Sequence, residues 1–400
     1  MIRYIDEIDC ADKKIFLRVD FNVPLDENAR ITDDHRIRAA LPTIRYALEN
    51  GAALIVASHL GRPKGKRVPE MSLVPVAERL SMLLERQVDM APDCIGPEAE
   101  KMSASLQPGQ ILLLENLRYH KEEQANDQNF ARALASLAQV YVNDAFAVSH
   151  RAHASVVGVP AFLRECAAGF LLKNEITYFK KAMHEPARPL LAILGGAKVS
   201  SKLGAIENIL PKVDAIIIGG AMANTFLLAK GIPVGRSLVE PDLKETAISI
   251  MKQAEAADTR FLLPVDCVVA SDISPDADYR TVPVGDIPED MMVVDIGPET
   301  VDLYRQVISE AATIVWNGPM GAFEIEPFSK GTMKIAQAVG SSQALSIIGG
   351  GDTDLAVSMV GEADNVSYMS TGGGAFLMLL EGKELPGFKA LEDCGSMTGE

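Results

Sequence analysis

The chain contains few cysteines, and none of them forms a paired motif. The five residues Cys10, Cys94, Cys166, Cys267 and Cys394 are widely spaced, and no C-x-x-C pattern occurs. An odd number of scattered cysteines argues against a disulfide framework and against a thiolate zinc site. It is typical of a protein that is kept in a reducing compartment.

Long apolar runs are also missing from the sequence. No run approaches the ~20 residues that a transmembrane helix needs. Asp6 and Glu7 stand where a signal peptide would have its apolar segment. We therefore expect a cytoplasmic protein without a membrane partner.

Positive charge is scarce: 38 Lys and Arg stand against 54 Asp and Glu, for a formal net charge of −16. This balance argues against a general nucleic-acid binder. The excess of negative charge is unevenly distributed along the chain. Residues 1–167 hold 20 basic and 23 acidic residues, whereas residues 168–400 hold 18 basic and 31 acidic residues. Five of the six histidines also lie in the first part. The first half is thus only slightly acidic and can hold a site for an anionic small molecule.

Several familiar catalytic and nucleotide-binding motifs do not occur. No G-x-x-x-x-G-K-[ST] is present, which excludes a P-loop kinase, and no clean G-x-G-x-x-G follows the first expected strand. G-x-S-x-G, H-E-x-x-H and EF-hand loops are absent as well. These absences argue against a nicotinamide dinucleotide site and against the hydrolases that those motifs mark.

Short apolar runs alternate with helical stretches along the chain. The expected strands are residues 15–20, 54–58, 111–115 and 140–144, then 190–195, 215–218, 261–265, 293–296, 313–316, 345–348 and 368–370. Near-continuously apolar strands are typical of sheets buried on both faces. Helices between them imply right-handed βαβ units. The pattern predicts an α/β protein with doubly wound parallel sheets.

A chain of 400 residues is longer than a single hydrophobic core usually stabilises, so we expect two domains. Leu172, Ile176, Phe179 and Met183 share one face of an expected helix, which Pro186 then ends. The expected organisation is an N-terminal domain at 1–167, a connecting helix with a hinge at 168–183, a C-terminal domain at 184–382 and a tail at 383–400.

Basic and polar residues follow the expected strands of the first half. They occur in residues 18–24, 58–63, 115–118 and 143–153, and Arg36 lies at the start of an expected helix. Ligands of open α/β sheets bind beyond the carboxyl ends of the strands. Several Arg residues and a His at one sheet edge predict a cationic site for phosphate and carboxylate oxygens. Taken singly, each Arg also fits a surface charge, and His59 or His153 a structural role.

Glycine turns follow the expected strands of the second half, at residues 195–196, 219–220, 318–321, 349–351 and 372–374. Such turns let the backbone approach a ligand, and helix starts after them favour phosphate. The carboxylate of Asp352 beside one turn suits Mg²⁺. Lys198 and Lys202 would lie on one side of a helix, a spacing that suits two phosphoryl groups. Plain strand-to-helix turns and a surface helix face remain the alternatives.

Together and in this order, the motifs resemble the phosphoglycerate kinase family over nearly the whole chain. The stretches that carry the resemblance are residues 18–24, 58–63, 150–153, 195–200, 316–319 and 349–353. The resemblance implies two Rossmann-like domains and reversible transfer of a phosphoryl group from 1,3-bisphosphoglycerate to Mg-ADP, giving 3-phosphoglycerate and ATP. It also implies a monomer, with Mg²⁺ accompanying the nucleotide and no nucleic-acid partner.

The resemblance further implies roles for individual residues. The residues that would bind 3-phosphoglycerate are Asp20, Phe21, Asn22, Arg36, His59, Leu60, Gly61, Arg62, Arg118 and Arg151. Those that would bind the nucleotide are Lys202, Gly219, Gly220, Asn317, Pro319, Glu324, Gly350, Gly351, Asp352 and Thr353. Asp352 would hold the metal, and the catalytic residues would be Arg36, Lys198, Gly350 and Gly373. The tail would pack on the N-terminal domain, with no role assigned to Cys394–Glu400.

The implied reaction needs no general base, because the carboxylate of 3-phosphoglycerate is ionised at neutral pH. It needs positioning and cations around the transferring phosphoryl group, and domain closure that excludes water. Two other classes are considered. A two-domain dehydrogenase would need the missing dinucleotide motif. A phosphate-binding solute receptor would need a signal peptide and would have no use for Lys198 and Asp352.

Overall fold

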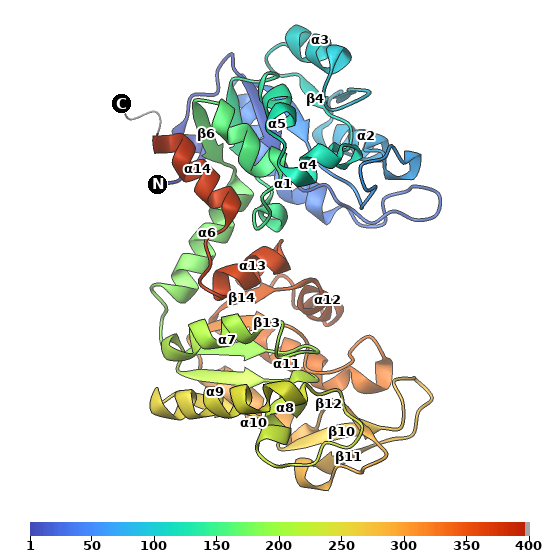
Figure 1. Cartoon of the computed structure of the whole chain (residues 1–400), viewed down its shortest axis with the longest axis vertical. Helices are drawn as coiled ribbons and strands as arrows, with labels where there is room; N and C mark the ends of the chain where they lie inside the picture. Colours follow the sequence, from blue (N-terminus) through green and yellow to red (C-terminus); the bar gives the residue numbers. More distant parts are fainter. Residues whose placement is uncertain (397–400) are drawn as a thin grey trace. The chain divides into compact units, whose positions relative to one another are not determined.

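The computed structural model describes residues 1–396 and divides into two compact units (Figure 1). Unit 1 comprises Met1–Ile176 and the C-terminal segment that begins at Glu384, and unit 2 comprises Thr177–Lys383. The division falls within helix α6 (Phe170–Met183). Residues 397–400 lie outside the described part, so the expectations for the tail at 383–400 and for Cys394–Glu400 apply here only as far as Ser396.

Unit 1 is built on a six-stranded parallel sheet with the strand order β3-β4-β2-β1-β5-β6. The strands are β1 (Lys14–Arg18), β2 (Ala53–Ala57), β3 (Asp89–Met90), β4 (Ile111–Leu113), β5 (Val140–Asn143) and β6 (Glu165–Ala168). All residues of β2 and β5 are buried, as expected for strands covered on both faces. The sequence analysis missed β3, which has two residues, and β6, which lacks the β-branched residues typical of strands.

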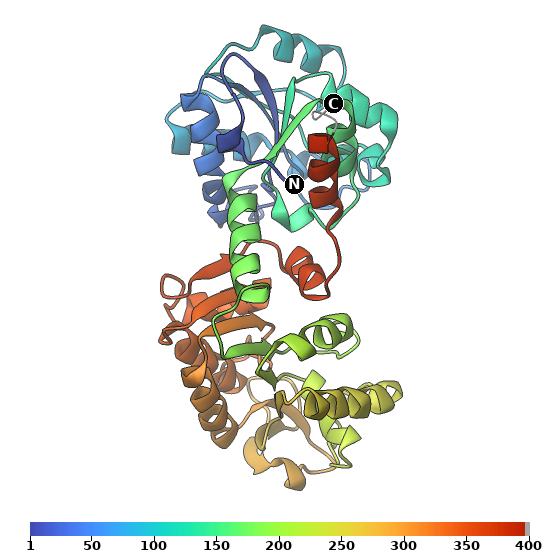
Figure 2. The ribbon, with the colours of Figure 1, turned by 90° about the vertical axis from the view of Figure 1, so that its left-hand side faces the viewer.

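Helices lie on both sides of this sheet (Figure 2). They are α1 (His35–Glu49), α2 (Val74–Leu84), α3 (Pro97–Ser105), α4 (Lys121–Ala125), α5 (Gln128–Ala135) and α14 (Pro386–Ser396). Ile37 and Ile44 of α1 pack with Val76 and Leu80 of α2 against the strands in one core. Helix α14, at the C-terminal end, contacts strand β6.

Cys166 of β6 and Cys394 of α14 form a disulfide, although they are 228 positions apart. The prediction that the scattered cysteines form no disulfide framework is therefore wrong for this pair. Spacing along the chain could not reveal the bond, because it depends on the return of the last helix to the first sheet. Cys10, Cys94 and Cys267 are free and buried.

Unit 2 contains a second six-stranded parallel sheet, in the order β15-β14-β13-β7-β8-β9. The strands are β7 (Leu190–Leu194), β8 (Ala215–Ile218), β9 (Arg260–Leu262), β13 (Thr313–Asn317), β14 (Leu345–Gly349) and β15 (Tyr368–Ser370). Numbered within the sheet, this is the 3-2-1-4-5-6 order, in which ligands bind where the strand order reverses. The reversal lies between β7 and β13.

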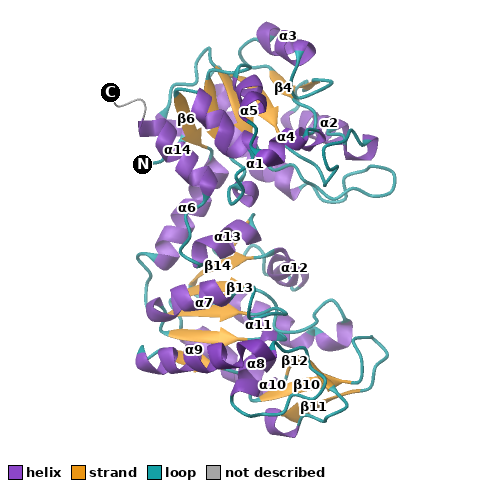
Figure 3. Ribbon diagram, in the orientation of Figure 1, coloured by secondary structure: helices purple, strands orange, loops and turns teal. Residues whose placement is uncertain are grey.

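Helices flank this sheet as well (Figure 3). They are α7 (Leu203–Ile209), α8 (Met222–Ala229), α9 (Lys244–Ala256), α10 (Pro298–Glu310), α11 (Lys330–Gly340), α12 (Gly351–Met359) and α13 (Gly373–Leu380). Tyr304 of α10 and Ile335 of α11 pack with Trp316 of β13 in the main core of the unit. No helix within residues 1–396 is long and apolar enough to cross a membrane.

A three-stranded antiparallel sheet was not predicted. It consists of β10 (Asp266–Ala270), β11 (Tyr279–Pro283) and β12 (Met292–Ile296), with β10 in the middle. The run 293–296, expected among the parallel strands, therefore belongs to this sheet, which corrects the prediction. The neighbours β10 and β11 are joined by residues 271–278, which are fewer than the dozen that a parallel crossover needs, so the two strands pair antiparallel.

Candidate functional site

Basic side chains gather at the carboxyl ends of the strands in unit 1. Arg18 ends β1, Arg118 lies in the short 3-10 helix η3 (Leu117–Tyr119) after β4, and Arg151 follows β5. Burial, together with the charges of Arg18 and Arg151, lowers the pKa of Arg118 to about 10. The guanidinium groups are thus close enough to repel one another. Because an anion bound between them would relieve this repulsion, the cluster suits an anionic ligand.

Two histidines within this basic cluster are kept neutral. Burial lowers the pKa of His59 well below its usual range, and Arg18 and Arg118 add to the effect. The pKa of His153 falls to about 3 through burial and the charge of Arg118. Nδ1 of His59 lies 3.3 Å from Nη2 of Arg18 and 3.7 Å from the carboxylate of Asp20. A neutral imidazole offers one donor and one acceptor, so His59 can orient a ligand without adding charge.

Hydrogen bonds hold several of the predicted unit 1 residues together. Nη1 of Arg36, in the first turn of α1, pairs with the carboxylate of Asp20. Oδ1 of Asn22 accepts a 2.8 Å hydrogen bond from the N–H of Gly61. The carbonyl of Gly61 in turn accepts from Nη1 of Arg118, also at 2.8 Å. The structure thus brings these residues to one region of the sheet edge.

The other predicted residues of unit 1 are placed differently. The side chains of Phe21 and Leu60 are buried, so their backbone is the part that can face a ligand. Arg151 contacts His150, whose Nε2 lies 3.2 Å from Nε of the arginine. Arg62 is exposed and has no hydrogen-bond partner within residues 1–396. Arg62 is therefore not hydrogen-bonded to the other predicted residues, although it directly follows Gly61, which is.

A buried polar network beneath the basic cluster was missed by the sequence analysis. Ser155 donates from its N–H (2.9 Å) and from Oγ (2.6 Å) to the fully buried carboxylate of Glu123, and Nε of Arg18 donates to Oγ of Ser155 at 2.8 Å. Glu123 thereby holds the serine that positions Arg18. An Arg within a buried strand is a signal that could have been used, because buried charges are rarely unpaired. Glu123 gives no such signal, since α4 is polar along its length.

In unit 2 the glycine turns meet at the reversal between β7 and β13. Gly195 donates its N–H to the carbonyl of Asn317, and Gly196 donates to the carbonyl of Pro319, both at 3.0 Å. A Cβ atom on Gly220 would lie 2.5 Å from the backbone N of Gly196. The turns that follow β7, β8 and β13 are therefore packed backbone to backbone.

Two helices begin side by side next to these turns. Helix α12 begins at Gly351, directly after Gly350, whose φ of +108° favours glycine. Helix α13 begins at Gly373, where a Cβ atom would lie 2.9 Å from Cα of Gly350. Helix starts carry free N–H groups and partial positive charge. Two of them at this distance form a site that suits phosphate oxygens.

Lys202 is a buried cation beside these helix starts. Its Nζ donates to the carbonyl oxygen of Asn317 at 3.1 Å and to the side-chain oxygen of the same residue. Nδ2 of Asn317 donates to the carbonyl of Gly349 at 2.6 Å, and the N–H of Gly318 donates to Oγ1 of Thr353 at 2.7 Å. Asn317 thus links the lysine to the end of β14, from which α12 begins.

The pKa of Lys202 is lowered to about 8 by burial, and the charge of Asp352 opposes this shift. Asp352 is exposed in the first turn of α12. Magnesium takes one or two carboxylates and completes its shell with waters and substrate phosphates. One exposed carboxylate next to a phosphate-binding pair of helix starts fits that donor set.

The helix expected to join Lys198 and Lys202 is absent, which corrects the prediction. Lys198 lies in an irregular segment and Lys202 in a turn, both before α7, which begins only at Leu203. Lys198 is exposed whereas Lys202 is buried, so the two ammonium groups have different surroundings. The chain turns at Gly196, where φ is +113°, and this geometry prevents a helix from starting directly after β7. Glu324, predicted to bind the ribose, is exposed.

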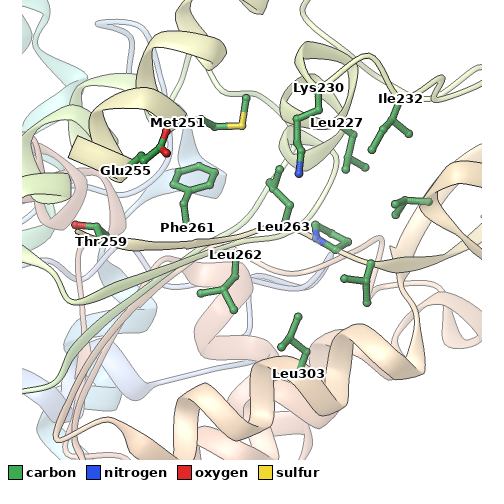
Figure 4. Close-up of a pocket in the computed structure, with 13 residues that line it drawn as sticks. Leu227, Lys230, Ile232, Met251, Glu255, Thr259, Phe261, Leu262, Leu263 and Leu303 are labelled. Carbon is green, nitrogen blue, oxygen red and sulfur yellow. The ribbon is translucent and has the colours of Figure 1, made fainter. Parts of the chain in front are cut away.

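A hollow of about 740 Å³ lies elsewhere in unit 2, at the edge strand β9 (Figure 4). Leu227 of α8, Met251 of α9, Phe261 of β9 and Leu303 of α10 contribute to its lining. None of the predicted site residues lines it. The size of this hollow therefore does not mark the predicted nucleotide site.

The two units together have the features of a two-domain phosphotransferase. One unit has clustered arginines, and the other has paired helix starts, a buried lysine and a carboxylate. Comparison with known proteins identifies the family. A family model for phosphoglycerate kinase matches residues 5–383. The chain belongs to the phosphoglycerate kinase family.

Curated relatives and solved structures agree with this assignment. The phosphoglycerate kinases of Geobacter metallireducens and Desulfotalea psychrophila are 57% and 58% identical to the chain, over 98% of it and over 99% and 100% of the relatives. The structure of phosphoglycerate kinase from Coxiella burnetii has a TM-score of 0.90 and 42% identity, covering 98% of this chain and 99% of that one. The structure from Pyrococcus horikoshii has a TM-score of 0.83 and 32% identity, with coverage of 99% and 100%.

These findings confirm the resemblance and the fold class seen in the sequence. The chain is an enzyme, a phosphotransferase, and it acts on small-molecule substrates. The dehydrogenase and solute-receptor alternatives are set aside, because family, relatives and solved structures all point to phosphoglycerate kinase.

Proposed function

We propose that unit 1 binds 3-phosphoglycerate or 1,3-bisphosphoglycerate and that unit 2 binds Mg-ADP or Mg-ATP, between which the enzyme transfers a phosphoryl group in line. The observation that carries this division is the convergence of the α12 and α13 starts with buried Lys202 in unit 2. Backbone N–H groups with one lysine suit nucleotide phosphates that arrive with a metal. Clustered arginines suit a ligand that has a phosphate, a carboxylate and no metal.

Arg118 illustrates how unit 1 is prepared for its ligand. A guanidinium has five N–H donors, of which Nη1 is used by Gly61, whereas buried Nε has no hydrogen-bond partner among the described residues. Asp20, held between Arg36 and His59, is placed to accept a hydrogen bond from a substrate hydroxyl. The substrate-binding set remains Asp20, Phe21, Asn22, Arg36, His59, Leu60, Gly61, Arg62, Arg118 and Arg151.

The transfer itself needs positioned charge rather than a proton acceptor. A carboxylate oxygen of 3-phosphoglycerate forms the new bond to the γ-phosphorus of ATP as the bond to the ADP oxygen breaks. Arg36 and Lys198, with the N–H groups of Gly350 and Gly373, offset the charge on the transferring phosphoryl oxygens. Both cationic side chains are partly or fully exposed, so they can reach a group that is bound at the surface of each unit.

In unit 2, Asp352 holds the metal and Lys202 holds nucleotide phosphates. When bound, Mg²⁺ offsets phosphate charge and fixes the orientation of the phosphate chain. The N–H groups of Gly350, Gly351 and Thr353 add donors at the start of α12. The proposed nucleoside contacts are Gly219, Gly220, Asn317, Pro319 and Glu324.

Because the two substrates are assigned to different units, transfer requires that the units bring them together. We assign this movement to residues 168–183, which include α6, and we expect it to exclude water from the acyl phosphate. The proposal includes a cytoplasmic monomer. The Cys166–Cys394 disulfide is the feature that argues against a reducing compartment.

The direct test is a coupled assay with 3-phosphoglycerate and Mg-ATP, in which the acyl phosphate is consumed by reduction. We expect turnover that requires both substrates and that falls when Mg²⁺ is chelated. Omission of 3-phosphoglycerate gives the background rate. A folded protein, judged by a cooperative thermal transition, that shows no turnover would contradict the proposed function.

A further inference from the structure

Asp93, Cys94 and His120 form a cluster in unit 1 that the phosphoryl-transfer site does not use. A carboxylate oxygen, the thiol sulfur and an imidazole nitrogen all lie within 4.8 Å of one another. Asp93 and Cys94 follow strand β3, and His120 ends helix η3, which follows β4. Since β3 and β4 pair with each other, the sheet brings the two loops together.

The geometry of the cluster leaves one side open. Nε2 of His120 lies 2.7 Å from Oδ1 of Asp93, and the same oxygen accepts a 2.7 Å hydrogen bond from the N–H of Cys94. Cys94 is fully buried, whereas the side chains of Asp93 and His120 are 40% and 25% exposed. The ring of His120 packs 5.2 Å from that of Phe130, which fixes its orientation. The sulfur thus lies on the inner side, and the other two groups lead to solvent.

We propose that Asp93, Cys94 and His120 are three ligands of a site for a divalent ion of the zinc class, with a fourth position open to water. Zinc binds thiolate, imidazole and carboxylate at about 2.0–2.3 Å in a tetrahedron, which places the donor atoms roughly 3.3–3.7 Å apart. The cluster reaches this geometry when the 2.7 Å contact between His120 and Asp93 opens by less than ~1 Å and the sulfur of Cys94, which lies within 4.8 Å of the other two donors, approaches them to about 3.5 Å.

The donor set decides the class of ion. Thiolate and imidazole favour Zn²⁺ and Co²⁺, whereas Mg²⁺ and Ca²⁺ prefer oxygen ligands. On binding, the thiol of Cys94 releases its proton to water and the sulfur bonds to the ion in its place. The sequence argued against a thiolate zinc site because it contains no paired cysteines. Here one cysteine meets its co-ligands only through the pairing of β3 and β4.

The site is connected to the substrate-binding region through the chain. His120 follows Arg118 by two residues and also precedes α4, which carries Glu123. An ion that holds His120 therefore restrains the segment that positions Arg118 and, through Ser155, Arg18. Occupancy of the site changes the affinity for 3-phosphoglycerate. This linkage rests on the proposed function, whereas the metal site itself does not.

The site is tested by titration of the untagged full chain with Co²⁺ alone, with the Cys166–Cys394 disulfide intact. We expect one Co²⁺ per chain with a thiolate-to-cobalt charge-transfer band, which Zn²⁺ removes. The band should be lost in Cys94→Ser, and affinity should fall at least ~10-fold in His120→Gln. Cys267→Ser, at a free buried cysteine of unit 2, is the matched control and should keep the band.

Two results would overturn the site: no charge-transfer band at saturating Co²⁺, or a band that survives in Cys94→Ser. If Cys94→Ser does not fold, as judged by its thermal transition, the partly exposed His120→Gln decides in its place. Cobalt held by the proposed magnesium residue Asp352 would give no thiolate band, so the two sites are distinguishable.

The linkage is measured separately, as the dissociation constant of 3-phosphoglycerate with and without saturating Zn²⁺. We expect a change of about 5-fold or more in the wild type and none in His120→Gln. Equal affinities in the wild type would overturn the linkage. Loss of 3-phosphoglycerate binding under all conditions, with the cobalt band intact, would contradict the proposed function and not the metal site.

Discussion

Lys202 should take up a proton when a nucleotide binds to unit 2. Without nucleotide, burial lowers the pKa of Lys202 from 10.5 to about 8. Nucleotide phosphates would bring negative charge next to Nζ, which favours the ammonium form. Binding should therefore return the pKa toward its ordinary value.

The size of the effect follows from the two pKa values. At pH 8 about half of the Lys202 side chains are protonated before binding and nearly all of them afterwards, so about 0.5 proton is taken up per nucleotide. The uptake should be about 0.1 at pH 7 and about 0.9 at pH 9. The phosphates add little at pH 8 and 9, because their second pKa lies near ~6, whereas at pH 7 their loss of about 0.1 proton would offset the uptake by Lys202.

The same shift predicts the direction of a stability change. A lysine whose pKa is lowered by folding destabilises the fold while it is charged, fully below pH 8, and the penalty disappears as pH rises toward 10.5. A shift from 10.5 to about 8 corresponds to on the order of 3 kcal/mol. Lys202→Met should therefore raise the free energy of unfolding at pH 7 by up to that amount, and by much less at pH 10.

Proton uptake is measured by calorimetric titration of Mg-ADP in two buffers of different ionisation enthalpy at pH 7, 8 and 9. Lys202→Arg keeps the positive charge but does not titrate in this range, so the uptake should vanish. Lys198→Met, at an exposed lysine of the same segment, should retain it. Uptake below about 0.1 proton at pH 8 in the wild type, or undiminished uptake in Lys202→Arg, would refute the reasoning.

Four further changes test the two units. Arg36→Ala should lower kcat roughly 10²–10³-fold with an unchanged dissociation constant for Mg-ADP, and near-normal turnover would remove Arg36 from the transition state. Asp352→Asn should weaken Mg-ADP binding at least ~10-fold in calorimetry while 3-phosphoglycerate affinity stays intact; equal losses would instead indicate misfolding. Gly373→Ala places a Cβ 2.9 Å from Cα of Gly350, so the helix starts must separate and KM for the nucleotide should rise, whereas an unchanged KM would argue against phosphate binding there. Cys394→Ser should lower the free energy of unfolding by about 2–4 kcal/mol without reductant and by nothing with it, and equal losses in both conditions would rule out the disulfide as the cause.

The sheet edges could be predicted from the sequence because parallel strands place all their carboxyl ends on one side. Once residues 15–20, 54–58 and 313–316 are recognised as strands, the polar or glycine-rich segments that follow the strands of one sheet must lie near one another at the edge of that sheet. The structure brings Asp20, Arg36 and His59 together in this way, and likewise the turns at Gly195 and Gly220. This part of the site depends on topology alone.

The features that were missed depend on contacts between segments that are distant in sequence. Lys198 and Lys202 look alike in the sequence, yet only Lys202 is buried, because its Nζ meets Asn317 at the end of another strand. Glu123 lies in a polar helix, and only its contact with Ser155 reveals it as a support for Arg18. The local sequence pattern predicts which face of a helix or strand is apolar. It does not predict which polar side chain forms a hydrogen bond with a residue that is distant in sequence.

Under the proposed function, the two units would neutralise phosphate by different means, and their proposed substrates account for the difference. A ligand without a metal requires fixed cations, and assembling them is unfavourable: burial and mutual repulsion lower the pKa of Arg118, and His59 is forced to stay neutral. The charge of buried Glu123 opposes part of this shift in the pKa of Arg118. A nucleotide that arrives with Mg²⁺ needs fewer fixed charges, so the helix starts with Lys198 and Lys202 would be sufficient. Replacing Lys202 by a second arginine cluster would therefore add repulsion without adding a needed charge, which is consistent with the glycine turns around Lys202 in unit 2.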